Sequence, residues 1–355
     1  MSALDYVRAD LRGYDGYLSA RKQNSGGQVL LNANESPVAQ AFDTLALNRY
    51  PEPQPQRLRE AMADYYGVRP DQLLVTRGSD EAIDLLIRAA CVPGQGRVAI
   101  QSPTFGMYAV CARLHAAEVL DIPLLDEGQQ FSWNIDAMIE QTLATGATVL
   151  FLCSPANPTG QSLPAEAMQR LLQALQGRCL VVIDEAYGEY STQASALKVL
   201  GQYENLAVLK TLSKAHALAG ARVGGVIASP ALIAVLKACQ APYPIAKPSA
   251  ETALQALSPQ ALDNTRSAVA SCLKERQGLH HALLALNDVI TVYPSDANFL
   301  LVRFQNPEKR YAHLLDNGIV VRAMAQYPAL HDCLRITVGS AEENNTLLTH
   351  LADQA

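Results

Sequence analysis

The sequence predicts an α/β protein with a three-layer α/β/α large domain, built on a mostly parallel seven-stranded sheet, and a smaller α+β domain after it. Between about residues 55 and 240, short apolar runs alternate with helical patterns, which is typical of parallel α/β sheets. Several runs, such as TVLFLC and CLVVID, are apolar at every position. Central strands that helices cover on both faces have this composition.

Seven apolar segments are expected to form the large sheet. The segment between the first two, SDEAIDLLIRAAC, places Ile83, Leu86, Ile87 and Ala90 on one helical face. The expected strands are 73–76, 97–100, 119–122, 148–153, 179–184, 206–210 and 223–228.

The pattern changes at APYPIAKPSAE (241–251), where three prolines lie close together. A long helical stretch is expected over 263–286, followed by strands in VITVY, NFLLVR, GIVV and CLRIT and a helix around 307–316. We therefore expect a large domain over 45–245. The small domain takes 246–355, with the N-terminal segment 1–44 grouped beside it because that segment has no clear core of its own.

Composition excludes several classes of protein. Of the 355 residues, 49% are hydrophobic and 17% are charged, and the net charge is −6 without a basic stripe. These values indicate a folded protein and give no sign of a nucleic-acid partner. No signal core or membrane-length apolar run is found, so a cytoplasmic protein with no membrane association is expected. The seven cysteines form no CxxC pair and are expected to be reduced, and the histidine spacings predict no metal site.

The segment TLSKAHALAGARVGG (211–225) follows an expected strand and is rich in small residues. A lysine in isolation is most often a solvated surface residue. Here Ser213 precedes Lys214, and Arg222 follows among glycines and alanines, so a planar ligand can approach the backbone. A lysine can form a Schiff base with an aldehyde, and an arginine can hold a phosphate through two hydrogen bonds. The segment therefore suits an aldehyde that carries a phosphate.

In CLVVIDEAYGEY (179–190), Asp184 ends an apolar strand, where α/β sheets bind their ligands. This carboxylate has three interpretations: a helix N-cap, a partner for a core arginine, or the group that keeps a pyridine nitrogen protonated. The last would make the ring an electron sink. Tyr187, three residues further on, is placed to bond a ring oxygen.

Two further segments follow strands. LCSPANPTG (152–160) contains a turn, and its Asn157 has an amide that can donate to a phenolate oxygen. In LLVTRGSDEAIDLL (73–86), Ser79 is expected to be a helix N-cap with Asp80 and Glu81 in the first turn. A helix start can also hold a phosphate on free N–H groups. The two acids would oppose an anion there, so Arg222 would be needed to offset them.

Together these segments resemble the fold-type I pyridoxal-phosphate enzymes, and within them the histidinol-phosphate aminotransferase family. LNANESP (31–37), RYPEPQP (49–55), TRGSDEAIDLLIRA (76–89) and CLRITVGS carry the resemblance further, so that it covers nearly the whole chain. The sequence departs from the family pattern at His216, where an aromatic residue is usual, and at Ala156, where an asparagine is common. Neither position is assigned to chemistry.

The resemblance implies a role for each of these residues. Lys214 would form the Schiff base and shuttle a proton, Asp184 would pair with the ring nitrogen, and Asn157 and Tyr187 would bind the ring oxygen. The other implied cofactor residues are Tyr108, stacked on the ring, Ser79, Asp80, Ser213 and Arg222 at the phosphate, and Tyr50 from a neighbouring subunit of a homodimer. The implied substrate residues are Arg335 at the anionic end of the substrates, with Arg322, Tyr17 and Asn34 at the phosphate or amino-acid end.

The activity that the resemblance implies is transamination with pyridoxal 5'-phosphate between histidinol phosphate and 2-oxoglutarate, giving imidazole acetol phosphate and glutamate. Two alternatives share the fold: a threonine-phosphate decarboxylase and an aminotransferase for aromatic amino acids. A third, a non-catalytic regulatory domain, would need an appended DNA-binding segment, and the first 30 residues are short and not basic.

Overall fold

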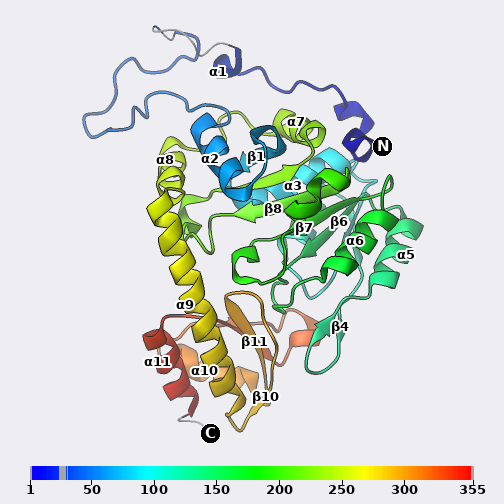
Figure 1. Cartoon of the computed structure of the whole chain (residues 1–355), viewed down its shortest axis with the longest axis vertical. Coiled ribbons are helices and arrows are strands. Elements are labelled where there is room, and N and C mark those ends of the chain that lie inside the picture. The colour runs from blue at the N-terminus through cyan, green and yellow to red at the C-terminus, as the bar shows by residue number, and fades with distance from the viewer. Residues whose placement is uncertain (1, 24–28, 30, 353–355) are drawn as a thin grey trace.

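The computed structural model describes residues 2–23, 29 and 31–352. Its centre is a seven-stranded sheet in the order β1-β9-β8-β7-β6-β2-β3 (Figure 1). Strands β3, β2, β6, β7 and β8 run parallel, and β9 runs antiparallel to both β8 and β1. The seven strands are β1 (Leu73–Thr76), β2 (Arg97–Ile100), β3 (Glu118–Asp121), β6 (Val149–Cys153), β7 (Leu180–Asp184), β8 (Leu206–Thr211) and β9 (Gly224–Ala228). The mostly parallel seven-stranded sheet is thus confirmed, with each strand within one residue of its expected bounds.

Helices cover both faces of this sheet. Because neighbouring residues of a strand point to opposite faces, Leu150 and Leu152 lie in one apolar cluster while Phe151 lies in the other. The helices on the face of Leu150 are α2 (Gln56–Tyr66), α5 (Ile135–Thr145), α6 (Ala165–Ala174) and α8 (Lys247–Ala256). Those on the face of Phe151 are α3 (Gly78–Ala90), α4 (Met107–Leu114) and α7 (Pro230–Cys239). These layers explain why the central strands are apolar at every position.

The small unit is a four-stranded antiparallel sheet in the order β10-β11-β13-β12, packed against three helices. Its elements are α9 (Pro259–Leu284), β10 (Val289–Val292), β11 (Phe299–Phe304), α10 (Pro307–Asp316), β12 (Arg322–Ala323), β13 (Cys333–Thr337) and α11 (Ala341–Ala352). Helix α9 runs along both units (Figure 1). The strand expected in GIVV (318–321) is wrong. The edge strand is β12, which begins at Arg322, directly after that segment, and pairs with β13 over two residues.

The N-terminal residues contact the large unit. Ala3, Tyr6 and Val7 belong to the apolar cluster of α3 and α7, although the expected domain division groups them with the small domain. Between α1 (Ala20–Gln23) and α2, residues 31–50 loop outside the body of the protein (Figure 1). The remaining short elements are η1 (Ala3–Tyr6), η2 (Ala9–Leu11), η3 (Pro70–Gln72), β4 (Leu125–Asp126), β5 (Phe131–Ser132), η4 (Gly188–Tyr190), η5 (Ala196–Gln202), η6 (Ala219–Ala221) and η7 (Pro328–Leu330).

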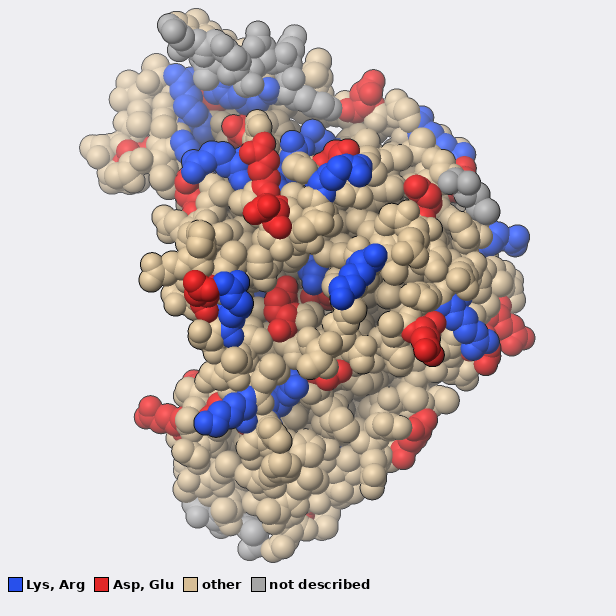
Figure 2. All heavy atoms as spheres, in the orientation of Figure 1, with Lys and Arg blue, Asp and Glu red and all other residues tan. Residues whose placement is uncertain are grey.

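The surface carries charges of both signs (Figure 2), and the cysteines are free thiols. Basic and acidic side chains are interspersed over the face drawn in Figure 2. Each of the seven cysteines is a free thiol, and five of them are buried. Within the described residues, no helix combines the length and apolar character that a bilayer span requires. The same residues hold no cluster of three or more His, Cys, Asp or Glu side chains suited to a metal ion.

Candidate active site

A cavity of about 140 Å³ lies beyond the carboxyl ends of β6, β7 and β8. The four segments singled out in the sequence meet there, because parallel strands carry the residues that follow them to one edge of the sheet. The lining residues are Ser79, Asp80, Phe105, Cys153, Asn157, Asp184, Ala186, Tyr187, Thr211, Ser213, Lys214, Ala219 and Arg222. The cavity therefore brings together one amine, one buried carboxylate, an amide, a phenol and a guanidinium group.

Lys214 supplies the amine, from the loop that follows β8. Its Nζ lies 5.5 Å from the centroid of the Tyr187 ring. Burial, followed by the positive charge of Arg335, lowers the pKa of Lys214. A lowered pKa increases the fraction of free amine near neutral pH, and the free amine is the form that attacks a carbonyl carbon.

Asp184, the last residue of β7, is 2% exposed. Its Oδ2 accepts a hydrogen bond from the Tyr108 hydroxyl at 2.8 Å, and its Oδ1 accepts from the Ala186 N–H at 3.1 Å. Among the described residues, no lysine or arginine forms an ion pair with it. Burial raises the pKa of Asp184 to about 6, although both hydrogen bonds act in the opposite direction. Neither an N-cap role nor a core arginine partner is seen, so the carboxylate is suited to a cation that enters the cavity.

The structure corrects the position expected for Tyr108. This residue is fully buried, and its ring stacks on Phe151 at 4.8 Å. Besides Tyr187, the cavity is lined by a second aromatic ring, that of Phe105, which the sequence analysis missed. Phe105 precedes α4, whereas Tyr108 lies inside that helix and points into the core. Tyr108 therefore acts on the site through Asp184 and does not stack in the cavity.

Ser79, Asp80, Ser213 and Arg222 form the polar end of the cavity. Arg222 pairs with Asp80 at 3.1 Å, and its Nη1 donates to the Ser213 hydroxyl at 3.4 Å. Helix α3 begins at Gly78, so the expected N-cap role of Ser79 is wrong and this residue lies in the first turn. The first N–H groups of a helix have no partner within it and favour an anion. Arg222 offsets the charge of Asp80, as the sequence analysis required.

Gly78 leaves room for the Arg222 guanidinium group at the polar end of the cavity. Its φ is +73°, and a Cβ atom at this position would lie 2.6 Å from Nη2 of Arg222. A side chain here would strain the backbone and displace the guanidinium group. The glycine of TRGSDE thus provides the room in which Arg222 faces the start of α3.

Asn157 and Tyr187 also line the cavity, and the Asn157 amide donates to the Tyr187 hydroxyl at 3.4 Å. Arg335 of β13 reaches Asn157 from the small unit: its Nη1 donates to Oδ1 of that residue, and its guanidinium lies 5.3 Å from the Phe299 ring centroid. Arg322 is the register partner of Arg335 on β12 and is exposed. Arg335 thus contacts a residue that lines the cavity, and Arg322 lies next to Arg335 on the neighbouring strand.

A second residue that the sequence analysis missed lies at the joint between the two units. Tyr327 donates a hydrogen bond from its hydroxyl to the Thr104 carbonyl at 2.6 Å, which links the small unit to the loop that holds Phe105. Burial raises the pKa of Tyr327, and the charges of Arg335 and Arg322 act against that rise. A lone tyrosine in the segment MAQYPAL gives no sequence signal for this role.

Three further predicted residues do not line the cavity of their own chain. Tyr17 and Tyr50 are 67% and 51% exposed, and Asn34 is also exposed. All three lie on the N-terminal part of the chain that precedes α2. The Tyr50 ring stacks on Tyr243 at 4.6 Å, away from the residues that line the cavity. Their roles stay predictions.

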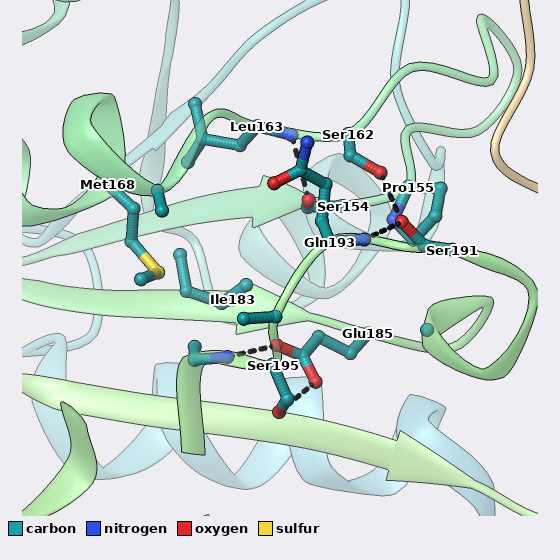
Figure 3. Close-up of a pocket in the computed structure, with 14 residues that line it drawn as sticks. Ser154, Pro155, Ser162, Leu163, Met168, Ile183, Glu185, Ser191, Gln193 and Ser195 are labelled. Atoms are coloured by element: carbon teal, nitrogen blue, oxygen red, sulfur yellow. Dashed lines mark hydrogen bonds between the residues drawn. The ribbon is translucent and has the colours of Figure 1, made fainter. Parts of the chain in front are cut away.

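A smaller cavity of about 60 Å³ lies beside the end of β7 (Figure 3). Within it Glu185 accepts hydrogen bonds from the Ser195 hydroxyl and the Ala196 N–H, each at 2.6 Å. The Ser162 and Ser191 hydroxyls bond each other at 2.9 Å. These polar groups are hydrogen-bonded to one another. The Ser162–Ser191 bond links the loop that carries Asn157 to the loop that carries Tyr187.

Comparison with known proteins agrees with this geometry. Residues 23–351 match the family model "Aminotransferase class I and II". A histidinol-phosphate aminotransferase of Xanthomonas euvesicatoria pv. vesicatoria is 53% identical over 351 residues, or 99% of this chain and 97% of the relative. The histidinol-phosphate aminotransferase structure from Clostridium acetobutylicum has a TM-score of 0.78 at 23% identity, and covers 87% of this chain and 91% of that one. The Sinorhizobium meliloti structure, solved in complex with pyridoxal-5'-phosphate, has a TM-score of 0.78 at 22% identity, and covers 86% and 82%.

These matches and the site define an aminotransferase of class I and II, and the chain belongs to that family. Within it, the chain groups with the histidinol-phosphate aminotransferases, which supply the curated relatives that match it over almost its whole length. The structures from Clostridium acetobutylicum and Sinorhizobium meliloti, at 23% and 22% identity, show that the chain has their fold, which is the fold-type I arrangement expected from the sequence.

Proposed function

We propose that this chain is a cytoplasmic, homodimeric, pyridoxal-phosphate-dependent aminotransferase that interconverts histidinol phosphate plus 2-oxoglutarate and imidazole acetol phosphate plus glutamate. The observation that carries the proposal is that one cavity holds both Asp184, a buried carboxylate to which no described lysine or arginine is ion-paired, and Lys214, an amine of lowered pKa. The names of the curated relatives support the substrate.

The lining residues fit pyridoxal phosphate. Arg222, Ser213 and the first N–H groups of α3 would hold its phosphate. Asp184 would hold the proton on its ring nitrogen, while Asn157 and Tyr187 would bind the ring oxygen. Phe105 supplies an aromatic face. When bound, the group supplies an aldehyde for amines and a cationic ring that withdraws electrons from the substrate carbon.

The residues of the chain then divide the work of proton transfer and orientation. The Lys214 amine would take the proton from the substrate carbon that bears the nitrogen and would pass it to the cofactor. Asp184 would stay ionised and would keep the ring nitrogen in its protonated form. Arg335 binds the carboxylate or phosphate of the substrate, with Arg322 next to it on the neighbouring strand. The two arginines favour a substrate with a dianionic end over a bare aromatic amino acid.

A direct assay tests the proposal. Purified protein supplied with pyridoxal phosphate is mixed with histidinol phosphate and 2-oxoglutarate, and glutamate is measured. Glutamate should form with histidinol phosphate and much more slowly with histidinol or phenylalanine, and no carbon dioxide should be released from threonine phosphate. Carbon dioxide release without glutamate would instead favour a decarboxylase, which the aminotransferase names of the curated relatives do not support.

A further inference from the structure

The Glu35 carboxylate is buried in a part of the chain that exposes many large apolar side chains. The segment from Tyr14 to Tyr50, which we call the arm, exposes a set of large apolar side chains. Those that the structure describes are Tyr14, Tyr17, Leu18, Val29, Leu31, Val38, Phe42, Leu47 and Tyr50, each at least 50% exposed. In contrast, the Glu35 side chain is 2% exposed and that of Arg21 is 6% exposed. Burial of charge in an exposed arm calls for a physical reason, because desolvation of a carboxylate is costly unless its partners compensate.

Glu35 joins three points of the arm. Nη2 of Arg21 donates to both of its carboxylate oxygens at 2.7 Å, and Nη1 of Arg49 donates to Oε2 at 3.0 Å. The backbone N–H of Tyr50 donates to Oε1 at 2.7 Å. Burial would raise the pKa of Glu35, but the hydrogen bonds from Tyr50, Arg49 and Arg21 lower it overall. The Glu35 carboxylate is therefore ionised at neutral pH, and both of its oxygens accept hydrogen bonds.

These contacts fix two of the three residues of the arm that were assigned to an active site, namely Asn34 and Tyr50. Tyr50 is held directly through its N–H, and its ring is set against Tyr243. Asn34 is the residue before Glu35 and has a φ of +54°, a left-handed conformation that asparagine tolerates but that needs support from its surroundings. Both side chains remain exposed. Glu35 thus sets the backbone of two predicted site residues whose side chains do not line the cavity of their own chain.

We infer that Glu35 is a positioning residue that acts in trans: it holds Asn34 and Tyr50 of one subunit in place for the active site of a second copy of this chain. The inference rests on the proposed function and on the shared sites of the proposed homodimer. Its support is the contrast between the fixed backbone and the exposed side chains, and the failure of Tyr50 to line the cavity of its own chain.

The test uses mixed dimers with a single working lysine, purified through two different tags. In the first, one chain carries Lys214→Ala and Glu35→Gln and the other chain is unaltered. In the second, one chain carries Lys214→Ala and the other carries Glu35→Gln. Both dimers contain the same substitutions, so a general loss of folding would affect them alike. Only the first places the altered arm at the working lysine of the other chain.

A role in trans predicts that the first dimer loses at least about tenfold in kcat/KM and binds pyridoxal phosphate more weakly, since small displacements of positioning groups have effects of this size. The second dimer should keep the activity of the reference dimer, which pairs Lys214→Ala with an unaltered chain. Equal activities, or loss in the second dimer only, would overturn the inference. Inactivity of the reference dimer would contradict the proposed function instead.

Two further variants make the test robust. Glu52→Gln is the matched control, because Glu52 is an exposed carboxylate close to Tyr50 in sequence that accepts a hydrogen bond from the Gln56 N–H. In the first arrangement it should behave like the reference dimer. If Glu35→Gln does not fold, Glu35→Asp is used in both arrangements. Glu35→Asp keeps the charge and shortens the reach, and the same difference between the two dimers is expected.

Discussion

The hydroxyl of Tyr108 donates a 2.8 Å hydrogen bond to Oδ2 of Asp184, and both residues are buried. This bond stabilises the ionised form of a carboxylate that burial would otherwise protonate. Tyr108, which was expected to stack on the cofactor ring, thus stabilises the Asp184 carboxylate instead. The charge at the floor of the cavity depends on both residues.

Tyr108→Phe should lower kcat/KM by about 10-fold to 100-fold, because hydrogen bonds to charged groups contribute about 1.5–3 kcal/mol. The ring and its stacking on Phe151 are kept, so the fold should persist. A pH profile provides the check: the acid limb of kcat/KM should move to higher pH, since the pKa of Asp184 rises when the bond is lost. An unchanged acid limb would show that Tyr108 does not support the carboxylate.

Asp184→Asn should separate stability from activity. In the cofactor-free protein the folded pKa of about 6 lies above the ordinary 3.8. The ionised carboxylate therefore costs stability, fully above pH 6 and not at all below pH 4. Removal of the charge should stabilise the cofactor-free protein at pH 7.5 by about 3 kcal/mol, and the gain should vanish near pH 4. Turnover should fall about 100-fold or more, as for other preorganised electrostatic groups. Denaturant unfolding and the glutamate assay measure the two effects, and a variant that is less stable at pH 7.5 would refute the charge assignment.

Gly78→Ala should weaken cofactor binding. The new methyl group would meet Nη2 of Arg222 at 2.6 Å, so the guanidinium group must move from its place at the start of α3. Gly67→Ala is the matched control, because Gly67 has a similar φ of +67° with open space around its missing Cβ. Both variants should lose about 1 kcal/mol of stability from backbone strain, but only Gly78→Ala should raise the dissociation constant for pyridoxal phosphate. Equal cofactor affinities in a spectroscopic titration would contradict the role of Arg222.

His216→Phe should stabilise the protein, most of all in acid. His216 is 6% exposed, and neither ring nitrogen has a hydrogen-bond partner among the described residues. Burial and then the charge of Lys210 lower the pKa of His216 to about 4 from 6.5. Because the unfolded chain binds the proton more readily, the histidine costs increasing stability as pH falls from 6.5 towards 4. The gain should be about 1–3 kcal/mol at pH 7.5 and larger at pH 5, by denaturant unfolding of cofactor-loaded protein. His281→Phe, at an exposed position of α9, is the control, and a gain independent of pH would count against this account.

Features that depend on local sequence patterns could be predicted, whereas features that depend on contacts between distant segments could not. The strands and the four cavity segments are encoded by local apolar patterns and by their place after each strand, so both were predicted. The choice between Phe105 and Tyr108 depends on where α4 begins, which TFGMY does not indicate. The edge strand β12 has two residues and is defined by its partner β13, so no local pattern marks it. Glu35 could not be singled out, because its partners lie 14 and 15 residues away in segments without periodicity.

Borohydride reduction tests the central claim, which is that the amine of Lys214 bonds the cofactor aldehyde. The protein is loaded with pyridoxal phosphate, reduced, digested and analysed by mass spectrometry. Lys210 is an internal control on the same segment: Glu185 holds it in an ion pair at 2.7 Å, and although burial alone would lower the pKa of Lys210, Glu185 and Glu189 raise it. We expect the pyridoxyl group on Lys214, none on Lys210 and none at position 214 after Lys214→Ala. A label on another lysine, or no label, would contradict the account.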